Sequence, residues 1–170
     1  RMNLNTFLRQ GAFKNKSVIK HAVKLLTDKK AIEKSKVFPY QLYTAFKYAA
    51  DTMPFELTEA LQDAMETAID NVPAFEGQVW IFPDVSQSMS DPVTGKRDGS
   101  TSKIRNIDVA ALVTAAVLRK NPSAKVVPFD TGVHPTQFNP RDSVMTNAKT
   151  LAGFGGGGTN CALPMDYVNA

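Results

Sequence analysis

The chain has 170 residues, a formal net charge of +4 and one cysteine, and 43% of its residues are apolar. This composition is typical of a globular protein and excludes collagen-like and disordered chains. No apolar run is long enough to span a membrane and no secretory signal opens the chain, so we expect no membrane association. Cys161 has no internal disulfide partner, which favours a reducing, cytoplasmic compartment and excludes a four-thiolate zinc site.

The charge is distributed unevenly along the chain. Residues 1–50 hold 11 Lys and Arg against two Asp and Glu, whereas residues 51–80 hold seven acidic residues and no basic one. A basic N-terminal third suits a polyanionic partner such as RNA, DNA or an anionic membrane. A solvated helical face, balanced by the acidic helix that follows it, is the alternative, and charge alone does not separate the two.

Residues 1–75 have the pattern of several helices. Ser17 is the predicted N-cap of a helix over residues 18–26, and Pro39 and Pro54 are placed to begin two more. Short connections between helices predict antiparallel pairs, the unit from which α-solenoids are built, although the helices differ too much to prove a repeat. The helix after Pro54 is expected to face inward with Leu57, Leu61, Ala64, Met65 and Ala68.

The pattern changes near residue 76, where short apolar runs begin to alternate with helices. Such alternation predicts a parallel sheet covered on both faces, with ligands at the carboxyl ends of its strands. Within the first strand, Trp80 and Phe82 are expected to belong to the core. The predicted strands span 78–82 and 124–129, and the predicted helices span 106–119, 143–151 and 160–167.

One carboxylate and two hydroxyls follow the first predicted strand on alternate residues. Asp84, Ser86 and Ser88 would face the same way in an extended loop, so three oxygens could converge on one point. Hard oxygen ligands with little charge suit Mg²⁺, Mn²⁺ or Ca²⁺ rather than zinc. The alternative is an Asp and two Ser that cap the start of a loop.

A glycine-rich loop, residues 153–158, precedes Thr159 and the last predicted helix. Glycines allow close approach of the backbone, and Thr159 adds another hydroxyl. A phosphate-binding loop is excluded, because no Lys follows the glycines in the required order.

The segments DVSQSM and GGTN together resemble the metal-ion-dependent adhesion site of von Willebrand factor type A domains. This resemblance implies that Asp84, Ser86, Ser88 and Thr159 hold a divalent ion, Mg²⁺ above all, with Mn²⁺ or Ca²⁺ as alternatives. The family's third-loop Asp follows a later strand, which would lie beyond Ala170. The domain is therefore expected to be incomplete at its C-terminus, and to need flanking polypeptide or a second chain.

The helical part narrows the resemblance to Ro-type ribonucleoproteins, the TROVE-domain family. Residues 2–11, 34–42 and 60–64 are similar to segments of that family, in the same order, and GGTNCALPM continues the match. The implied fold is an α-helical, HEAT-like repeat segment over residues 1–75, followed by the first half of an α/β von Willebrand type A domain over residues 76–170, Rossmann-like with a parallel sheet.

Ro-type proteins bind small noncoding Y RNAs and accept the ends of misfolded RNAs, so the resemblance implies a role in RNA quality control. Small noncoding RNA and misfolded RNA are then the expected partners, with an RNA-processing exonuclease as a further candidate. The alternatives are a metal-dependent adhesion or scaffold module without RNA binding, and a metal-free relative. The basic side chains expected to meet phosphates are Arg9, Lys14, Lys16, Lys20, His21 and Lys24.

No enzymatic activity is expected, because no general base is apparent and no His or Asp has the spacing of a catalytic triad. Cys161 is expected to be a small buried side chain at a helix start. The polar loop over residues 91–102 would either lie over the metal or be mobile. Two positions depart from the family: Gln87 stands where small residues are common, and Asn160 where Asp is frequent.

Overall fold

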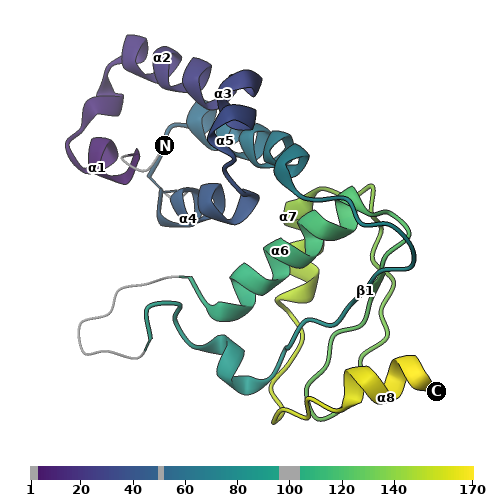
Figure 1. The fold of residues 1–170 in the computed structure, drawn as a ribbon. Helices are drawn as coiled ribbons and strands as arrows, with labels where there is room; N and C mark the ends of the chain where they lie inside the picture. Colours follow the sequence, from purple (N-terminus) through teal and green to yellow (C-terminus); the bar gives the residue numbers. More distant parts are fainter. Residues whose placement is uncertain (1–3, 50–51, 96–103) are drawn as a thin grey trace. The chain divides into compact units, whose positions relative to one another are not determined.

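The computed structural model describes residues 4–49, 52–95 and 104–170 and divides into two compact units, residues 1–72 and 73–170 (Figure 1). Each unit is described by itself.

The first unit is helical and is organised around its last long helix. Its elements are α1 (Leu4–Arg9), the 3₁₀ turn η1 (Ala12–Lys14), α2 (Lys16–Leu26), α3 (Lys29–Ser35), α4 (Pro39–Ala49), α5 (Phe55–Ala68) and η2 (Ile69–Asn71). Helix α5 packs against α2, α3 and α4. Its predicted inward residues are all buried, together with Ala60. Burying this stripe against three helices supplies the unit with its core.

Helix α2 begins earlier than expected. Asn15, not Ser17, is the N-cap, and the Asn15 side chain accepts hydrogen bonds from both the backbone N–H and the hydroxyl of Ser17. Asn and Ser are comparable caps, and the extended backbone at Asn15 decides between them. Pro39 does begin α4, and Pro54 is the N-cap of α5, as predicted.

The second unit is built on a parallel strand pair. Strands β1 (Trp80–Ile81) and β2 (Lys125–Val126) pair with Trp80 opposite Lys125. They are shorter than predicted, but backbone hydrogen bonds continue the ladder to Phe129 N–Pro83 O at 3.0 Å and Val85 N–Phe129 O at 2.9 Å. The carboxyl ends of both strands therefore lie side by side, which brings the loops that follow them together.

Helix α6 (Asn106–Lys120) crosses between the two strands and packs against α7 (Val144–Leu151). Its first turn is closed by Arg105 and Asp108, joined at 2.9 Å, and its last by the buried side chain of Asn121. Asn121 also accepts a hydrogen bond from the backbone N–H of Phe75 at 2.8 Å. That bond fixes where the chain enters the second unit. The C-terminal helix is α8 (Leu163–Asn169).

Trp80 and Phe82 were predicted to be core residues, and this prediction is wrong. Both side chains are half-buried on the sheet, stacked on each other at 6.0 Å between ring centroids. Tyr167 of α8 meets both rings edge-on, and the Lys125 ammonium lies 4.5 Å from the centroid of the indole ring. A single short helix covers less of this face than a full layer would, which leaves the aromatic edges exposed.

Among the described residues, no helix is long and apolar enough to cross a lipid bilayer.

Candidate functional site

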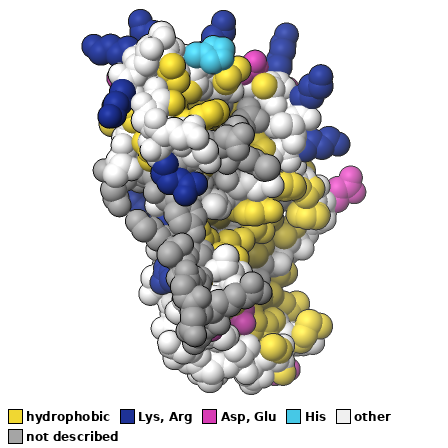
Figure 2. All heavy atoms as spheres, turned by 90° about the vertical axis from the view of Figure 1, so that its left-hand side faces the viewer, with side chains coloured by type: hydrophobic (Ala, Val, Ile, Leu, Met, Phe, Trp, Pro, Cys, Tyr) yellow, Lys and Arg dark blue, Asp and Glu magenta, His cyan; other side chains and the backbone are white. Residues whose placement is uncertain are grey.

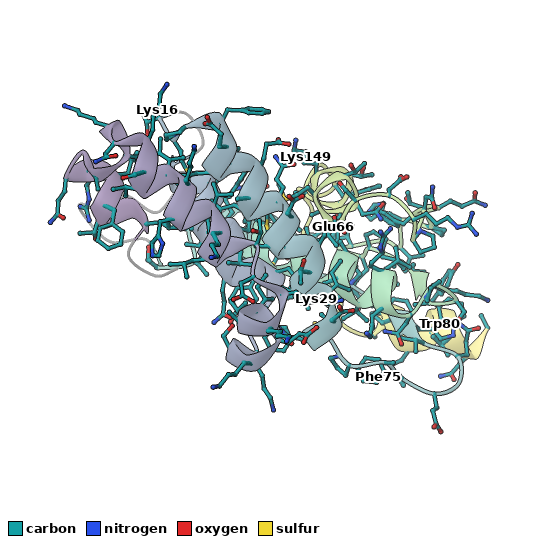
Figure 3. The ribbon with its side chains drawn as sticks, turned by 90° about the horizontal axis from the view of Figure 1, so that it is seen from above. Lys16, Lys29, Glu66, Phe75, Trp80 and Lys149 are labelled. Atoms are coloured by element: carbon teal, nitrogen blue, oxygen red, sulfur yellow. The ribbon has the colours of Figure 1, made fainter. Side chains whose placement is uncertain are left out.

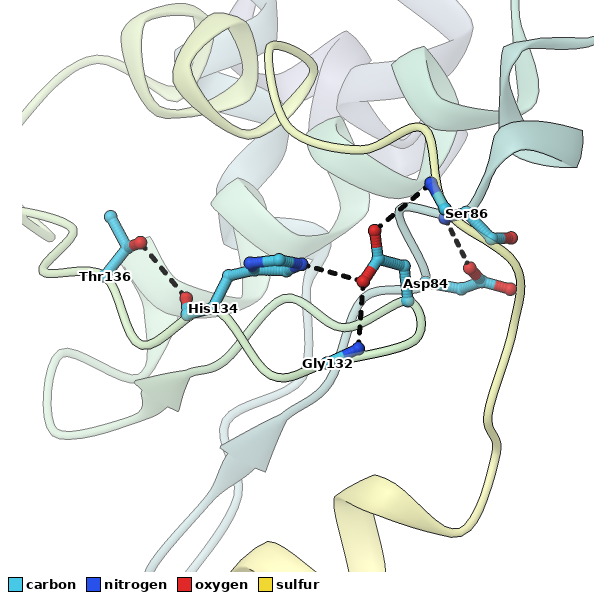
Figure 4. A network of polar contacts seen from close by, with 7 residues as sticks. Asp84, Ser86, Gly132, His134 and Thr136 are labelled. Carbon is cyan, nitrogen blue, oxygen red and sulfur yellow. Dashed lines mark hydrogen bonds and ion pairs between the residues drawn. The ribbon is translucent and has the colours of Figure 1, made fainter.

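The loop after β1 brings three of the predicted ligands together. Asp84 Oδ1 accepts a hydrogen bond from the backbone N–H of Ser86 at 2.8 Å, which turns the carboxylate toward the following residues (Figure 4). The hydroxyls of Ser86 and Ser88 lie 3.3 Å apart. Ser86 is only 2% exposed, whereas Ser88 is exposed in the short 3₁₀ turn η3 (Gln87–Ser90).

The donor set of this loop fits a hard divalent ion. Adjacent ligands around an octahedral Mg²⁺ lie about 3.0 Å apart, and around Ca²⁺ about 3.4 Å, so the two hydroxyls have the separation of neighbouring ligands. Among the residues that the structure describes, no three His, Cys, Asp or Glu side chains cluster. Neutral oxygens, such as the hydroxyls of Ser86 and Ser88, would therefore join Asp84 in any coordination shell formed here.

The glycine-rich loop lies directly against this loop, and the approach is close enough to require glycine, which has no side chain. The backbone N–H of Gln87 donates to the carbonyl of Gly157 at 2.8 Å. Gly155 has a φ of +111°, and a Cβ there would collide with the carbonyl oxygen of Val85. The same loop carries Thr159, which is exposed. Within the described ranges, no hydrogen bond joins the Thr159 hydroxyl to Asp84, Ser86 or Ser88.

Asp130 belongs to this region but is not among the predicted ligands, because it follows the second strand and was not counted as the family's third-loop Asp. It directly follows Phe129, which bridges to Asp84 across the strand pair, so it stands at the same edge of the sheet. The residue as a whole is only 7% exposed. Its carboxylate accepts from the backbone N–H groups of Gly132 at 3.0 Å and Gly157 at 3.3 Å. A third bond, at 2.9 Å, joins it to His134 Nε2 (Figure 4).

These contacts lower the pKa of Asp130 below its usual value of 3.8. The backbone N–H of Gly132 has the largest effect, followed by the hydrogen bond from His134. Burial acts in the opposite direction and is outweighed. Asp130 is therefore ionised at neutral pH, and its negative charge holds the loop after β2 and the glycine-rich loop together.

The signal for Asp130 was present in the sequence. Ligands bind at the carboxyl ends of parallel strands, so a carboxylate directly after the second strand lies at the same ligand-binding edge as Asp84. The hydrogen bond between Asp130 and His134 could not be predicted. Neither residue lies in a helix, and outside a helix a spacing of four residues does not determine whether two side chains meet. His134 is a loop residue, and its ring lies 6.1 Å from that of Phe154.

The family departures have local explanations. Asn160 Oδ1 accepts from the backbone N–H of Ala162 at 3.1 Å, so the side chain closes the turn that leads into α8. The backbone N–H of Asn160 donates to the backbone carbonyl of Asp130. Gln87 is exposed, and its amide oxygen lies beside Gly156. Cys161 was expected to be buried but is exposed and free. The loop expected over the metal includes residues 96–103, which lie outside the described residues.

The basic side chains predicted to meet RNA are all exposed in the helical unit. Arg9 ends α1 and Lys14 ends η1, whereas the remaining four lie along α2. Lys16, Lys20 and Lys24 recur every four residues and so share one face of that helix. Figure 2 shows Lys and Arg side chains projecting around the part of the surface that the helical unit forms, and Figure 3 shows Lys16 at the start of α2.

A parallel strand pair, a crossing helix and a DxSxS loop beside a glycine-rich loop define an α/β domain of the von Willebrand factor type A class. The family model of the Ro60 vWA domain matches residues 79–170, more than half of the chain. The chain therefore belongs to this family, and it is a Ro-type protein with a type A domain, as the motifs predicted.

A solved structure agrees with this assignment. The Ro (RSR) protein of Deinococcus radiodurans matches 98% of this chain with a TM-score of 0.77 and 22% sequence identity. At that identity the likeness shows the fold alone, and it includes both the helical segment and the type A domain. The chain spans 35% of the length of that protein. No curated protein matches the chain.

Proposed function

We propose that the chain is part of an RNA-binding protein that holds small noncoding RNA and the ends of misfolded RNA, and so serves RNA quality control. The observation that carries this proposal is the joining, in one chain, of a Ro60-type domain with a helical unit rich in exposed basic residues. The helical unit would be the end of a TROVE repeat module, and a small noncoding RNA resembling Y RNA would be the bound partner.

The charge pattern supports RNA as the partner rather than a protein. Lys16, Lys20 and Lys24 form a row on one face of α2, and successive positions in that row are about 6 Å apart along the helix axis. Three cations on one face can contact several backbone phosphates of an RNA. Contacts of this type give affinity that falls steeply with salt and depends little on sequence.

The type A domain would hold a divalent ion, Mg²⁺ above all, with Asp84, Ser86, Ser88 and Thr159 as ligands. The hydroxyl separation in the DxSxS loop supports this, and the backbone bond from Gln87 to Gly157 keeps the Thr159 loop nearby. A role as a binding protein without catalytic activity accompanies the proposal. The exposed free thiol of Cys161 suits the reducing cytoplasm, where an RNA-processing exonuclease would be a candidate partner.

The test is the binding of a structured RNA with a single-stranded 3′ tail across a salt series, by fluorescence anisotropy. We expect affinity to fall steeply with salt. The triple variant Lys16→Gln/Lys20→Gln/Lys24→Gln should bind at least about tenfold more weakly and lower the slope of log affinity against log salt by about 2.

The matched control is Lys30→Gln/Lys34→Gln/Lys36→Gln, which removes the same charge from α3 and its C-cap. It should change affinity much less than the α2 variant. Absence of binding by the unmodified chain at low salt would contradict the proposal and favour a metal-dependent adhesion module, whose binding to a protein partner would be lost on chelation.

A further inference from the structure

The helical unit contains a recess that its packing does not fill. The recess has a volume of about 410 Å³ and opens between α1, η1 and the chain leading into α5. Its walls are partly apolar and partly basic, and they include Leu8, Phe13, Pro54, Thr52, Arg9 and Lys14.

Within the described ranges, the charged side chains that line this recess are all basic. Arg9 and Lys14 line it, and no acidic side chain is among the lining residues that the structure describes. Both side chains are exposed, and neither forms an ion pair with a described residue. Two cations that lie together at a small recess attract an anion.

The turn at Gly11 determines where the Lys14 side chain lies. Gly11 has a φ of +71°, a left-handed conformation that lets the chain turn sharply between α1 and η1. The Lys14 side chain lies back along this turn, since a Cβ on Gly11 would come within 3.5 Å of Lys14 Cε and 4.0 Å of its Nζ. The Lys14 side chain therefore lies beside the Gly11 turn, and it lines the recess together with Arg9, the last residue of α1.

The recess also has an apolar wall, which can bind an apolar group of a ligand. Phe13 is 7% exposed and so is fixed in the unit's core, and Leu8 and Pro54 are half-buried beside it. A flat apolar ring would remove the exposed parts of Leu8 and Pro54 from water, while a phosphate attached to it would meet Arg9 and Lys14. Thr52 adds a hydroxyl that can donate to or accept from a sugar. An apolar ring, a sugar and a phosphate in one ligand describe a nucleotide.

We propose that this recess binds one nucleotide unit of a single-stranded RNA, with the base or ribose on Phe13, Leu8 and Pro54 and the phosphate on Arg9 and Lys14. The inference rests on the proposed RNA binding and adds a defined subsite to it. The volume lies at the lower end of the range for small-molecule pockets, which suits one nucleotide and excludes a duplex. The row of lysines on α2 would contact backbone phosphates, and the recess would hold a base.

The experiment uses the full chain and a short, fluorescently labelled oligouridylate that contains one 4-thiouridine. Anisotropy gives the affinity, and irradiation followed by peptide mapping gives the residues next to the base. The variant Arg9→Gln/Lys14→Gln is compared with Lys30→Gln/Lys34→Gln, which removes the same charge from exposed positions of α3. Uridine monophosphate and uridine serve as competitors.

We expect the Arg9/Lys14 variant to bind about tenfold more weakly than the α3 variant. Cross-links should fall within residues 8–14 or 52–54, and uridine monophosphate should compete better than uridine. Equal losses in the two variants, or cross-links confined to α2, would overturn this inference and leave the proposed RNA binding intact. Failure of the unmodified chain to bind the oligouridylate at low salt would overturn both.

Discussion

The carboxylate of Asp130 accepts hydrogen bonds from Gly132, His134 and Gly157, and these residues belong to two different loops. One side chain therefore connects the turn after β2 with the loop that carries Thr159. An Asn in its place would keep the size but replace one acceptor oxygen with a donor group, leaving it unable to accept all three bonds. A buried donor left without an acceptor costs more than the bond itself contributes.

Asp130→Asn should reduce the free energy of unfolding at neutral pH and should also flatten its dependence on acid pH. The pKa of Asp130 is lower in the folded protein than its usual value of 3.8, so the ionised carboxylate stabilises the fold at neutral pH. That contribution is complete above pH of about 4 and is lost as the pH falls through the pKa of the folded state. Urea unfolding at neutral pH and at several pH values below about 4 measures both effects.

The control for this prediction is Asp166→Asn, which alters an exposed carboxylate of α8 in the same unit. It should follow the pH dependence of the unmodified chain. If Asp130→Asn retained the full acid dependence, the hydrogen bonds to Asp130 would not contribute to stability.

At the scale of the element, the glycine-rich loop packs so closely against Asp130 and Thr131 that Gly157 has no space for a side chain. A Cβ on Gly157 would come within 2.8 Å of Asp130 Oδ2 and 3.0 Å of Thr131 Oγ1, in a region where Asp130 is already fixed by three bonds. Gly132 belongs to the same network, yet a Cβ there would meet nothing within 4 Å. Both glycines donate a backbone N–H to Asp130, but only Gly157 lacks space for a side chain.

Gly157→Ala should lower the free energy of unfolding by about 1–3 kcal/mol, because the new methyl group must displace a fixed carboxylate. Gly132→Ala keeps the backbone N–H that donates to Asp130 and should change stability by less than about 0.5 kcal/mol. Urea unfolding followed by the fluorescence of Trp80, the chain's only tryptophan, measures both. Equal stability of the two variants would show that the glycine-rich loop moves aside without cost.

Helices with strong local signals could be predicted from the sequence. Pro39 and Pro54 mark the starts of α4 and α5, and the apolar stripe of α5 is buried as its spacing predicted. The motifs also predicted the family and the order of strand, helix and strand. Two kinds of detail were wrong or missed. The cap of α2 depends on the backbone at Asn15, and the exposure of Trp80 depends on how much of the sheet α8 covers.

The candidate site could be predicted only as far as local spacing determines it. Asp84, Ser86 and Ser88 lie within five residues, so local structure alone brings them together. The loop was predicted to be extended but is not extended throughout: the 3₁₀ turn η3 carries Ser88 and brings its hydroxyl to 3.3 Å from that of Ser86. Asp130 comes beside them through pairing of β1 with β2 across more than forty residues, and only the strand register shows how close it lies. Whether Thr159 approaches Asp84 depends on a loop of glycines, whose freedom no spacing rule constrains.

At the scale of the whole molecule, the two units have separate cores, one around α5 and the other around α6. All four predicted metal ligands belong to the second unit, as does Trp80. The fluorescence of Trp80 therefore reports on the unit that would bind the ion, and a ligand that binds only the folded form must raise the temperature at which that unit unfolds.

Adding Mg²⁺ should raise the unfolding midpoint of this unit, and Asp84→Asn should remove the effect. At a hundredfold excess over its dissociation constant, an ion that binds only the folded form stabilises it by about 2.7 kcal/mol. For a unit of this size that corresponds to a shift on the order of 10 °C.

Asp84 is the only carboxylate in the predicted set, and Ser86 and Ser88 alone are neutral ligands too weak to replace it. Asp166→Asn, which removes the same charge outside the site, should keep the full shift. An equal shift in Asp84→Asn would place the ion elsewhere, whereas no shift in the unmodified chain would identify a metal-free member of the family, in which the hydroxyls of Ser86 and Ser88 serve only the loop.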